Sequence, residues 1–415
     1  MSFRDRKNTT GDIEKYVASR WDRTYPPDDP ACFPSPHAYV TPATSGHLKH
    51  LFYWDSYFSA IGLIAQGRMD LARSTLEALV HLFHQMGYVP NVNVEAGANR
   101  SQPPFLSHYV RFIYEATGDK EFLAKKITVL KKEYEFWMKE RAAPVEGLNK
   151  FGHCATDEYL KNFNDTCLCP RLGFQAEVSS DEKLRVGSHY LTEAESGADF
   201  CSRFLGRAND FMAIDLNALL YGYEMNFAWF AQELGQPEKA VFWHKTAARR
   251  KQLYSENFWN EERGFFFDYD SINGDHSPVY TPAAFFALWF GLASKEQARR
   301  MAESLPRLEA DHGIKASDKK HLGMDLQWDE PFGWPPHQYA TVHGLLNYGL
   351  EADAHRVARK YLDLMLRVFD ETGDLWEKYD VVAGNLKSCE YRVETQVGWT
   401  AAVFLDFSKM LNPNL

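Results

Sequence analysis

The 415-residue sequence has few cysteines and lacks long apolar runs. Its six cysteines are spread through the chain, too sparsely for the disulfide framework of a small secreted domain. No stretch of eighteen apolar residues is present, so we expect no segment to cross a membrane. The first residues, MSFRDRKNTTGDIEKY, also lack the apolar core of a secretory signal. These absences favour a cytoplasmic protein with reduced thiols and no membrane partner.

Basic residues are also in deficit. The chain has 46 Lys and Arg against 56 Asp and Glu, a formal net charge of −10. Nucleic-acid binding depends on basic contacts to phosphates, so we expect no nucleic-acid partner. The Cys-x-x-Cys spacing of common zinc sites is missing as well, because Cys167 and Cys169, with His153 upstream, are separated by a single residue. The sequence therefore predicts no metal site and no cofactor.

Linkers and strand signals are scarce, whereas helical periodicity runs through most of the chain. No segment rich in Ser, Gly or charge divides the sequence, which predicts one domain over residues 1–415. A hairpin is predicted in FFFDYDSINGDHSPVY, turning at Asn273-Gly274. Several predicted helices form pairs joined by short turns, as in antiparallel helical hairpins. Apolar residues recur at three- and four-residue spacing over 69–87, 121–140, 216–235, 237–259, 283–293, 340–350 and 351–373.

Two distant segments of the chain resemble each other. FWNEERGFFFDYD at 258–270 and VFDETGDLWEKYD at 368–380 both read as a helix end, an acidic turn with glycine, and a short aromatic strand ending in Tyr-Asp. Repeated helix pairs followed by loops at one end are typical of a toroid of paired helices. The pattern predicts an all-α toroid with a few short β-hairpins at the end where the loops meet.

Aromatic residues are unusually abundant: 29 Phe, 21 Tyr and 11 Trp make up 15% of the chain. Most of these rings are expected in the core, and the others could stack on the C–H faces of a sugar. Carboxylates accompany aromatic residues around Asp55, Asp199 and Glu377 and within QWDEPFGWPP at 327–336. Paired carboxyl groups among rings suit glycoside hydrolysis, in which one acid protonates the leaving oxygen and the second carboxylate activates water or attacks the anomeric carbon. The predicted partner is therefore a small saccharide.

Several segments resemble the trehalases, glycoside hydrolase family 37, and they follow one another along the chain in the order usual for that family. The stretch 327–336 is similar at all ten positions to the family signature Gln-Trp-Asp-x-Pro-x-Gly-Trp-Pro-Pro. The other segments that carry the resemblance are PNVNVEAGANRSQPPF, EAESGADFCSRF, AIDLNALLY, WEKYD and EYRVETQVGWT. Together the matches extend from about residue 40 to residue 405.

This resemblance implies an (α/α)6 toroid and an inverting hydrolysis of a small α-glucoside such as trehalose. By the resemblance, Asp199 would be the general acid and Glu377 the general base, with their carboxyl groups roughly 6.5–9.5 Å apart to leave room for a water. The prolines of 327–336 would stiffen a loop whose aromatic rings and carboxylate form one wall of the substrate funnel. The residues implied in substrate binding are Trp54, Asp55, Asn91, Arg100, Gln102, Trp328 and Glu390.

Departures from the family pattern concern the side of the site that would bind the leaving group, so the sequence does not determine which leaving group is accepted. His47 and His50 stand where Arg and Glu are expected, Val94 replaces an arginine, and VVAGNLKSCEY replaces a glycine-rich lid. The family's Arg-Pro-Glu-Ser segment has no counterpart. One alternative is an α-glucosidase or glucosyl- or mannosylglycerate hydrolase like those of glycoside hydrolase family 63. In such an enzyme, a smaller or acidic leaving group would be bound by His47, His50, Lys49 or Arg171. Another class is a sugar epimerase or a non-catalytic sugar-binding toroid, since fifteen histidines are present and binding needs the rings but not both acids.

Overall fold

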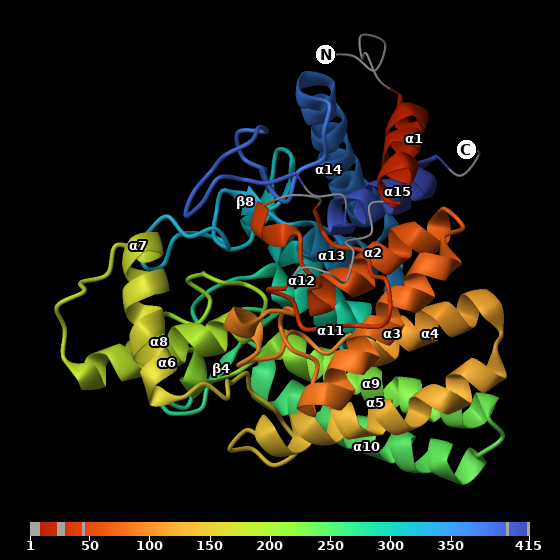
Figure 1. The fold of residues 1–415 in the computed structure, drawn as a ribbon, viewed down its shortest axis with the longest axis horizontal. Helices are drawn as coiled ribbons and strands as arrows, with labels where there is room; N and C mark the ends of the chain where they lie inside the picture. Colours follow the sequence, from red (N-terminus) through yellow and green to blue (C-terminus); the bar gives the residue numbers. More distant parts are fainter. Residues whose placement is uncertain (1–8, 23–29, 44–45, 396–397, 413–415) are drawn as a thin grey trace.

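The computed structural model describes residues 9–22, 30–43, 46–395 and 398–412. Six helices form an inner ring in which each helix contacts the next, and the last contacts the first (Figure 1). Because the chain closes this ring with its final helix, the N-terminal and C-terminal parts of the fold share one core. The ring consists of α2 (Tyr53–Ala65), α4 (Leu106–Thr117), α9 (Ile214–Glu233), α11 (Phe286–Trp289), α13 (Pro335–Asn347) and α15 (Gly398–Leu411).

A second layer of helices covers the ring from outside. Inner and outer helices alternate along the chain, which makes the fold an (α/α)6 toroid and confirms the predicted class. The outer helices are α1 (Thr10–Arg20), α3 (Met69–Met86), α5 (Lys120–Glu140), α10 (Pro237–Phe258), α12 (Lys295–Ser304) and α14 (Glu351–Thr372). Among the described helices, none combines the length and apolarity needed to cross a bilayer.

The two layers differ in pattern because they differ in burial. Helix α9 is surrounded by protein, and its residues from Ile214 to Tyr223 are all buried. Helix α14 instead buries one stripe, which includes Ala354, Val357 and Tyr361, and turns its charged residues outward. Gly373, with φ of +74°, ends α14 in the left-handed conformation that glycine adopts without steric cost.

Two predicted helices have different limits in the structure. The segment 283–293 forms only a 3-10 turn (Pro282–Phe285) followed by α11. The helix expected from residue 340 begins five residues earlier, at Pro335, so the last two prolines of QWDEPFGWPP occupy its first turn. Proline is tolerated there because the first helical N–H groups have no partner within the helix.

The strands are short and lie in the loops. The predicted hairpin is present, with β4 (Tyr269–Asp270) paired to β5 (Asp275–His276) and to β1 (Phe211–Met212). Three further antiparallel pairs join β2 (Trp259–Asn260) to β3 (Phe265–Phe266), β6 (Glu309–Ala310) to β7 (Gly313–Ile314), and β8 (Phe332–Gly333) to β9 (Tyr379–Asp380). The last pair brings the segment 327–336 beside WEKYD, although about fifty residues separate them in sequence.

The two similar segments also fold alike. Asp270 and Asp380 each end a short strand, and each accepts hydrogen bonds from the backbone N–H groups two and three residues later. In both turns a glycine then donates its N–H to the aspartate carbonyl, at 2.8 Å for Gly274 and for Gly384. The two segments therefore share the final strand and the turn that follows it, whereas the β2–β3 hairpin occurs in the first segment and α14 extends to Thr372 in the second.

A helical excursion between α5 and α9 has a small core of its own. It contains α6 (Asp157–Phe163), a π-helical turn (Asn164–Leu168), α7 (Cys169–Leu172) and α8 (Ser180–Glu195), drawn in yellow in Figure 1. Its apolar cluster is separate from the main core and includes Leu168, Leu191 and Phe200. The excursion carries Arg171 and Asp199 toward the loop end of the toroid.

Candidate active site

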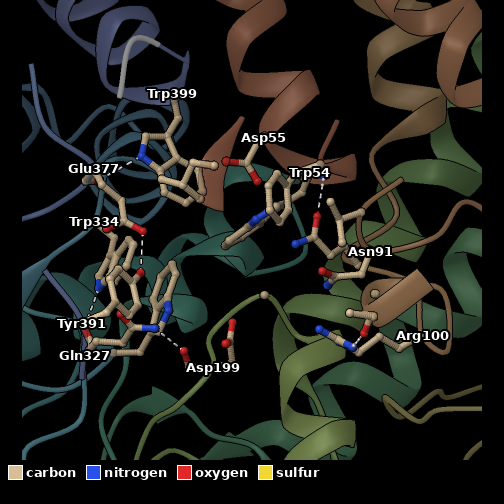
Figure 2. A pocket seen from close by; sticks show the side chains of 18 of the residues that line it. Trp54, Asp55, Asn91, Arg100, Asp199, Gln327, Trp334, Glu377, Tyr391 and Trp399 are labelled. Carbon is tan, nitrogen blue, oxygen red and sulfur yellow. Dashed lines mark hydrogen bonds between the residues drawn. The ribbon is translucent and has the colours of Figure 1, made fainter. Parts of the chain in front are cut away.

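The loop end of the toroid contains a cavity of about 400 Å³, a size usual for small-ligand sites. Eight of the nine site residues named from the sequence line it: Trp54, Asp55, Asn91, Arg100, Gln102, Asp199, Trp328 and Glu377. Figure 2 shows Asp199 and Glu377 reaching this cavity from different segments. The ninth residue, Glu390, does not line the cavity. Gln327 and Trp334, from the loop expected to form one wall, also line it, and so do Gly197, Tyr391 and Trp399, which sequence reasoning did not assign to the site.

Four tryptophans form one wall. The rings of Trp328 and Trp334 stack almost parallel, with centroids 3.8 Å apart. Trp54 lies 5.8 Å from Trp328 and Trp399, and its approach requires Gly197, where an added Cβ would lie 2.8 Å from the Trp54 ring. Flat aromatic faces at this spacing suit the apolar face of a sugar ring. The rigidity of the wall comes from tertiary contacts between four different segments.

Amide groups line the side near the start of α2. Gln102 accepts a hydrogen bond from the backbone N–H of Trp54 at 3.1 Å, which leaves its side-chain NH2 without a partner among the described residues. Asn91 donates to two backbone carbonyls, of Ser101 and Ala194. The loop that contains Ser101 and Gln102 is anchored by the buried Glu195, which accepts a hydrogen bond from the backbone N–H of Ser101 at 2.9 Å. The free ends of these amides can therefore serve sugar hydroxyls.

Asp199 lies in the loop that follows α8. No helix begins at Asp199: α8 ends at Glu195, and the next element is a 3-10 turn that begins at Ala208. Its Oδ2 accepts a hydrogen bond from Arg171 Nη1 at 3.1 Å, whereas Oδ1 has no partner among the described residues. About a third of the Asp199 side chain is exposed, on the cavity side. One carboxyl oxygen is thus held in place and the other is available to a ligand.

Glu377 is more deeply buried and is held by two donors. Its Oε1 accepts from the Tyr391 hydroxyl at 2.6 Å, and its Oε2 accepts from Lys378 Nζ at 2.8 Å. Its backbone carbonyl accepts from the indole N–H of Trp399 at 3.0 Å. Side chain and backbone are therefore both fixed, so the carboxylate faces the cavity in one orientation.

Gln327 connects the two acidic segments. Its side-chain NH2 donates to the backbone carbonyl of Asp199, and its side-chain oxygen accepts from Lys378 Nζ at 3.2 Å. Its own carbonyl accepts from the indole N–H of Trp334 at 2.8 Å. The first residue of QWDEPFGWPP thereby sets the relative position of the two carboxyl groups.

Glu390 lies behind Arg171 instead of on the cavity wall. Its Oε2 accepts from Arg171 Nε and Nη2, at 3.0 and 2.6 Å, and its Oε1 accepts from the backbone N–H of Gln327 at 3.0 Å. Burial raises the pKa of this carboxyl group, and the neighbouring Arg171 opposes the rise. Glu390 therefore orients Arg171, and Arg171 in turn contacts Asp199.

Asp329, within QWDEPFGWPP, has a structural role away from the cavity. Asp329 is fully buried and accepts from the backbone N–H and the hydroxyl of Ser202, three residues after Asp199. Burial raises its pKa to about 6, and the hydrogen bonds from Ser202 limit the rise. The expectation that the rings of this stretch line the cavity holds for Trp328 and Trp334, but Asp329 does not line it. It ties the loop to the Asp199 segment.

The residues that the sequence suggested for binding the leaving group do not all lie at the cavity. Arg171 lines the cavity, whereas Lys49, His50 and Val94 do not. His50 contacts the thiol of Cys32 at 3.4 Å. The side chain of His47 lies outside the described part of the structure. No cluster of three or more His, Cys, Asp or Glu side chains suited to a metal ion occurs among the described residues.

Comparison with known proteins gives the family. The family model described as Trehalase matches residues 10–412. The chain belongs to the trehalase family. Family members include the cytosolic neutral trehalase of Saccharomyces cerevisiae, 31% identical over 411 residues, covering 89% of this chain and 54% of that protein. The chain thus spans about half the length of this curated relative. A periplasmic trehalase of Pseudomonas aeruginosa is 30% identical over 426 residues, covering 97% of this chain and 77% of that protein.

Solved structures agree with the family assignment. The neutral trehalase structure from Saccharomyces cerevisiae superposes with a TM-score of 0.76 at 28% identity, covering 97% of this chain and 80% of that one. A family 63 mannosylglycerate hydrolase from Thermus thermophilus superposes with a TM-score of 0.68 at 18% identity, covering 95% of this chain and all of that one. At that identity the second likeness concerns the fold alone. Both trehalase-family and family 63 folds are therefore similar to this toroid.

Proposed function

We propose that this member of the trehalase family hydrolyses trehalose, or a closely similar small α-glucoside, with inversion at the anomeric carbon. The observation that supports the proposal is that two carboxyl groups, Asp199 and Glu377, share one tryptophan-walled cavity and are held by different sets of hydrogen bonds. Two acids with separate surroundings are what an inverting glycosidase needs.

In the proposed reaction Asp199 is the general acid and Glu377 the general base. Asp199 donates its proton from Oδ1 to the glycosidic oxygen as the bond from that oxygen to the anomeric carbon breaks. Glu377 removes a proton from a water that attacks the same carbon from the opposite face. The products are two glucose molecules. The water oxygen becomes the new hydroxyl of one, and the proton on Glu377 returns through solvent to Asp199.

The remaining lining residues bind the substrate. Trp54 and Trp328 would stack on the sugar in the cleaved subsite, and Asp55 would accept from its hydroxyls. Asn91, Gln102 and Arg100 would form hydrogen bonds to hydroxyls on the same side. We assign Glu390 to substrate binding only indirectly, through its two contacts with Arg171.

The test is hydrolysis of trehalose by the purified protein, followed by NMR. We expect one glucose of each pair to appear first as the β anomer. Replacing Asp199 with Asn or Glu377 with Gln should each lower kcat by about 10³-fold or more while trehalose still binds. An Asp199→Asn protein with full turnover would show that another group supplies the proton.

A second candidate is an α-glycoside with a smaller or acidic leaving group. It is favoured by the two cationic side chains on the cavity wall, Arg100 and Arg171, together with the departures at His47, His50 and Val94. Glucosylglycerate and mannosylglycerate are the substrates to offer beside trehalose. Turnover of either, with trehalose left intact, would replace the first proposal with this one.

We also propose that residues 1–415 act as a single catalytic domain in the cytoplasm. The closed helical ring, which begins near the N-terminus and ends near the C-terminus, supports the single domain. All six cysteines lie in the described part of the chain and are free thiols there, which agrees with a reducing compartment. The relatives include both cytosolic and periplasmic enzymes, so cell fractionation is the deciding measurement.

A further inference from the structure

The toroid contains a second cavity, of about 320 Å³, that shares none of its lining residues with the first. Its walls come from positions farther along the same inner helices. On α2, Trp54 lines the first cavity and Tyr57 the second; on α13, His343 and Asn347 line the second, whereas Trp334 caps the helix start at the first. The second cavity therefore lies toward the opposite end of the ring.

A layer of aromatic rings separates the two cavities. Phe58 and Phe105 in this layer are fully buried. The Phe58 ring lies 6.1 Å from Trp54 on the side of the first cavity and 6.4 Å from Trp289 on the side of the second. Trp289 lines the second cavity and stacks on Phe290 at 4.6 Å. A ligand in the second cavity would thus rest on an aromatic floor without reaching the two acids.

The Tyr57 hydroxyl is one hydrogen-bonding group that the wall of the second cavity offers to a ligand. The Tyr57 side chain is 8% exposed and lines the cavity, yet its hydroxyl forms no hydrogen bond within the described residues. The hydroxyl meets the open space of the cavity, where it is accessible to the hydroxyl group of a ligand. Removing the hydroxyl would leave the packing of the ring on Phe105 unchanged.

Positively and negatively charged side chains, paired with one another, lie around the Tyr57 hydroxyl. Arg111 Nε donates to Glu115 at 2.8 Å and its Nη1 donates to Asn226 at 3.1 Å, which leaves Nη2 without a partner in the described structure. His343 pairs with Asp406 at 2.7 Å. His108 is neutral, because burial lowers its pKa to about 3 and both ring nitrogens already have partners. The charges are paired, so the cavity offers hydrogen bonds without a strong preference for an anion or a cation.

We propose that this second cavity binds a neutral sugar of monosaccharide size. The Tyr57 hydroxyl and Arg111 Nη2 donate to its hydroxyl groups, the second carboxyl oxygen of Glu115 accepts from one, and the Trp289–Phe290 floor carries its C–H face. The site contains no acid and base arranged for hydrolysis, so it binds without cleaving. This inference does not depend on the proposed activity of the first cavity.

The experiment is fluorine NMR of the full chain labelled with 5-fluorotryptophan, titrated with D-glucose. The Trp289 resonance, assigned with Trp289→Phe, reports the second cavity, and those of Trp54 and Trp328 report the first. We expect Trp289 to shift with a dissociation constant of its own. Tyr57→Phe should weaken that constant by about fivefold, the effect of one neutral hydrogen bond, while trehalose hydrolysis stays unchanged.

The matched control is Tyr221→Phe, which removes a hydroxyl from an equally buried tyrosine outside the cavity. It should leave the Trp289 titration unchanged. Glu115→Gln, at a half-exposed position, tests the same site if Tyr57→Phe folds poorly. A Trp289 resonance that stays in place while Trp54 and Trp328 are saturated would overturn the proposal. So would a Trp289 shift caused by D-gluconate or D-glucosamine but not by glucose.

Discussion

Lys378 Nζ lies 2.8 Å from Oε2 of Glu377, the adjacent residue, and both side chains are buried. The same ammonium group lies 4.1 Å from the centre of the Tyr391 ring and 4.7 Å from that of Trp334. The pair is thus enclosed by two rings of the cavity wall. Consecutive residues in extended backbone usually point to opposite faces, so this contact depends on the bend at Glu377 that precedes β9.

Replacing Lys378 with Met should therefore impair catalysis more than binding. The change removes a donor to Glu377 and one to Gln327, so the base loses its fixed orientation. We expect kcat for trehalose to fall by about 10²-fold with a smaller change in KM, and the free energy of unfolding to fall by roughly 3 kcal/mol. Steady-state kinetics and urea unfolding measure both. Lys360→Met, at a pair with Glu309 outside the cavity in which Lys360 is 31% exposed, is the control and should retain activity.

Arg171→Lys should separate positioning from charge. Arg171 contacts Glu390 through two nitrogens and Asp199 through a third, and a lysine ammonium group cannot reproduce this planar fork. We expect kcat/KM to fall by about 10²-fold although the positive charge is kept. Arg185→Lys, in an exposed pair with Glu182, provides the comparison and should have no effect on kcat/KM. Equal rates for Arg171→Lys and the unmodified chain would mean that charge alone is needed.

Gly197→Ala should disturb the tryptophan wall. Gly197 has φ of +78°, and its added Cβ would lie 2.8 Å from the Trp54 ring. We expect the free energy of unfolding to fall by about 2–4 kcal/mol and KM for trehalose to rise, because Trp54 must move. Gly118→Ala separates the two causes: φ there is +65° but no atom lies within 4 Å, so only the backbone strain of about 1 kcal/mol remains. Similar losses in both variants would show that the contact with Trp54 is unimportant.

Glu133 should make stability depend on pH. It is buried between the hydroxyls of Tyr53 and Tyr223, and burial raises its pKa to about 7 from an ordinary value of 4.5. The unfolded chain therefore releases this proton at lower pH than the folded one, so the stability contributed by Glu133 is complete below about pH 4.5 and is lost as pH rises through 7. The loss amounts to about 3 kcal/mol.

Urea unfolding at pH 5 and pH 8 tests this expectation for Glu133. The difference in free energy of unfolding between the unmodified chain and Glu133→Gln should change by about 3 kcal/mol between the two pH values, in favour of the glutamine variant at pH 8. Glu77→Gln, at a partly exposed pair with Lys126, should give no such change. A difference that stays constant between pH 5 and 8 would place the Glu133 pKa outside this window.

Local sequence patterns determined the helices, their pairing and the repeated turn. Periodic apolar spacing, the glycine after α14 and the Asn273-Gly274 turn are signals carried by neighbouring residues. These elements formed where predicted, except over 283–293, where the α-helix is limited to Phe286–Trp289, and at the start of α13. The resemblance to trehalases added the two acids and six further residues that line the cavity. The sequence could not fix helix starts such as that of α13, because proline is compatible both with a loop and with a first turn.

Tertiary structure alone decided which of the candidate residues face the cavity and which are held behind its wall. Asp329 and Asp199 both follow aromatic or small residues in conspicuous motifs, yet one is buried against Ser202 and the other faces the cavity. Glu390 belongs to a family motif, but Arg171, 219 positions away, holds it behind the wall. These outcomes depend on contacts between segments far apart in the chain, and a hydrogen-bond partner that distant leaves no local pattern. The helical ring follows from periodicity, whereas the chemistry of its cavities follows from closure of the ring.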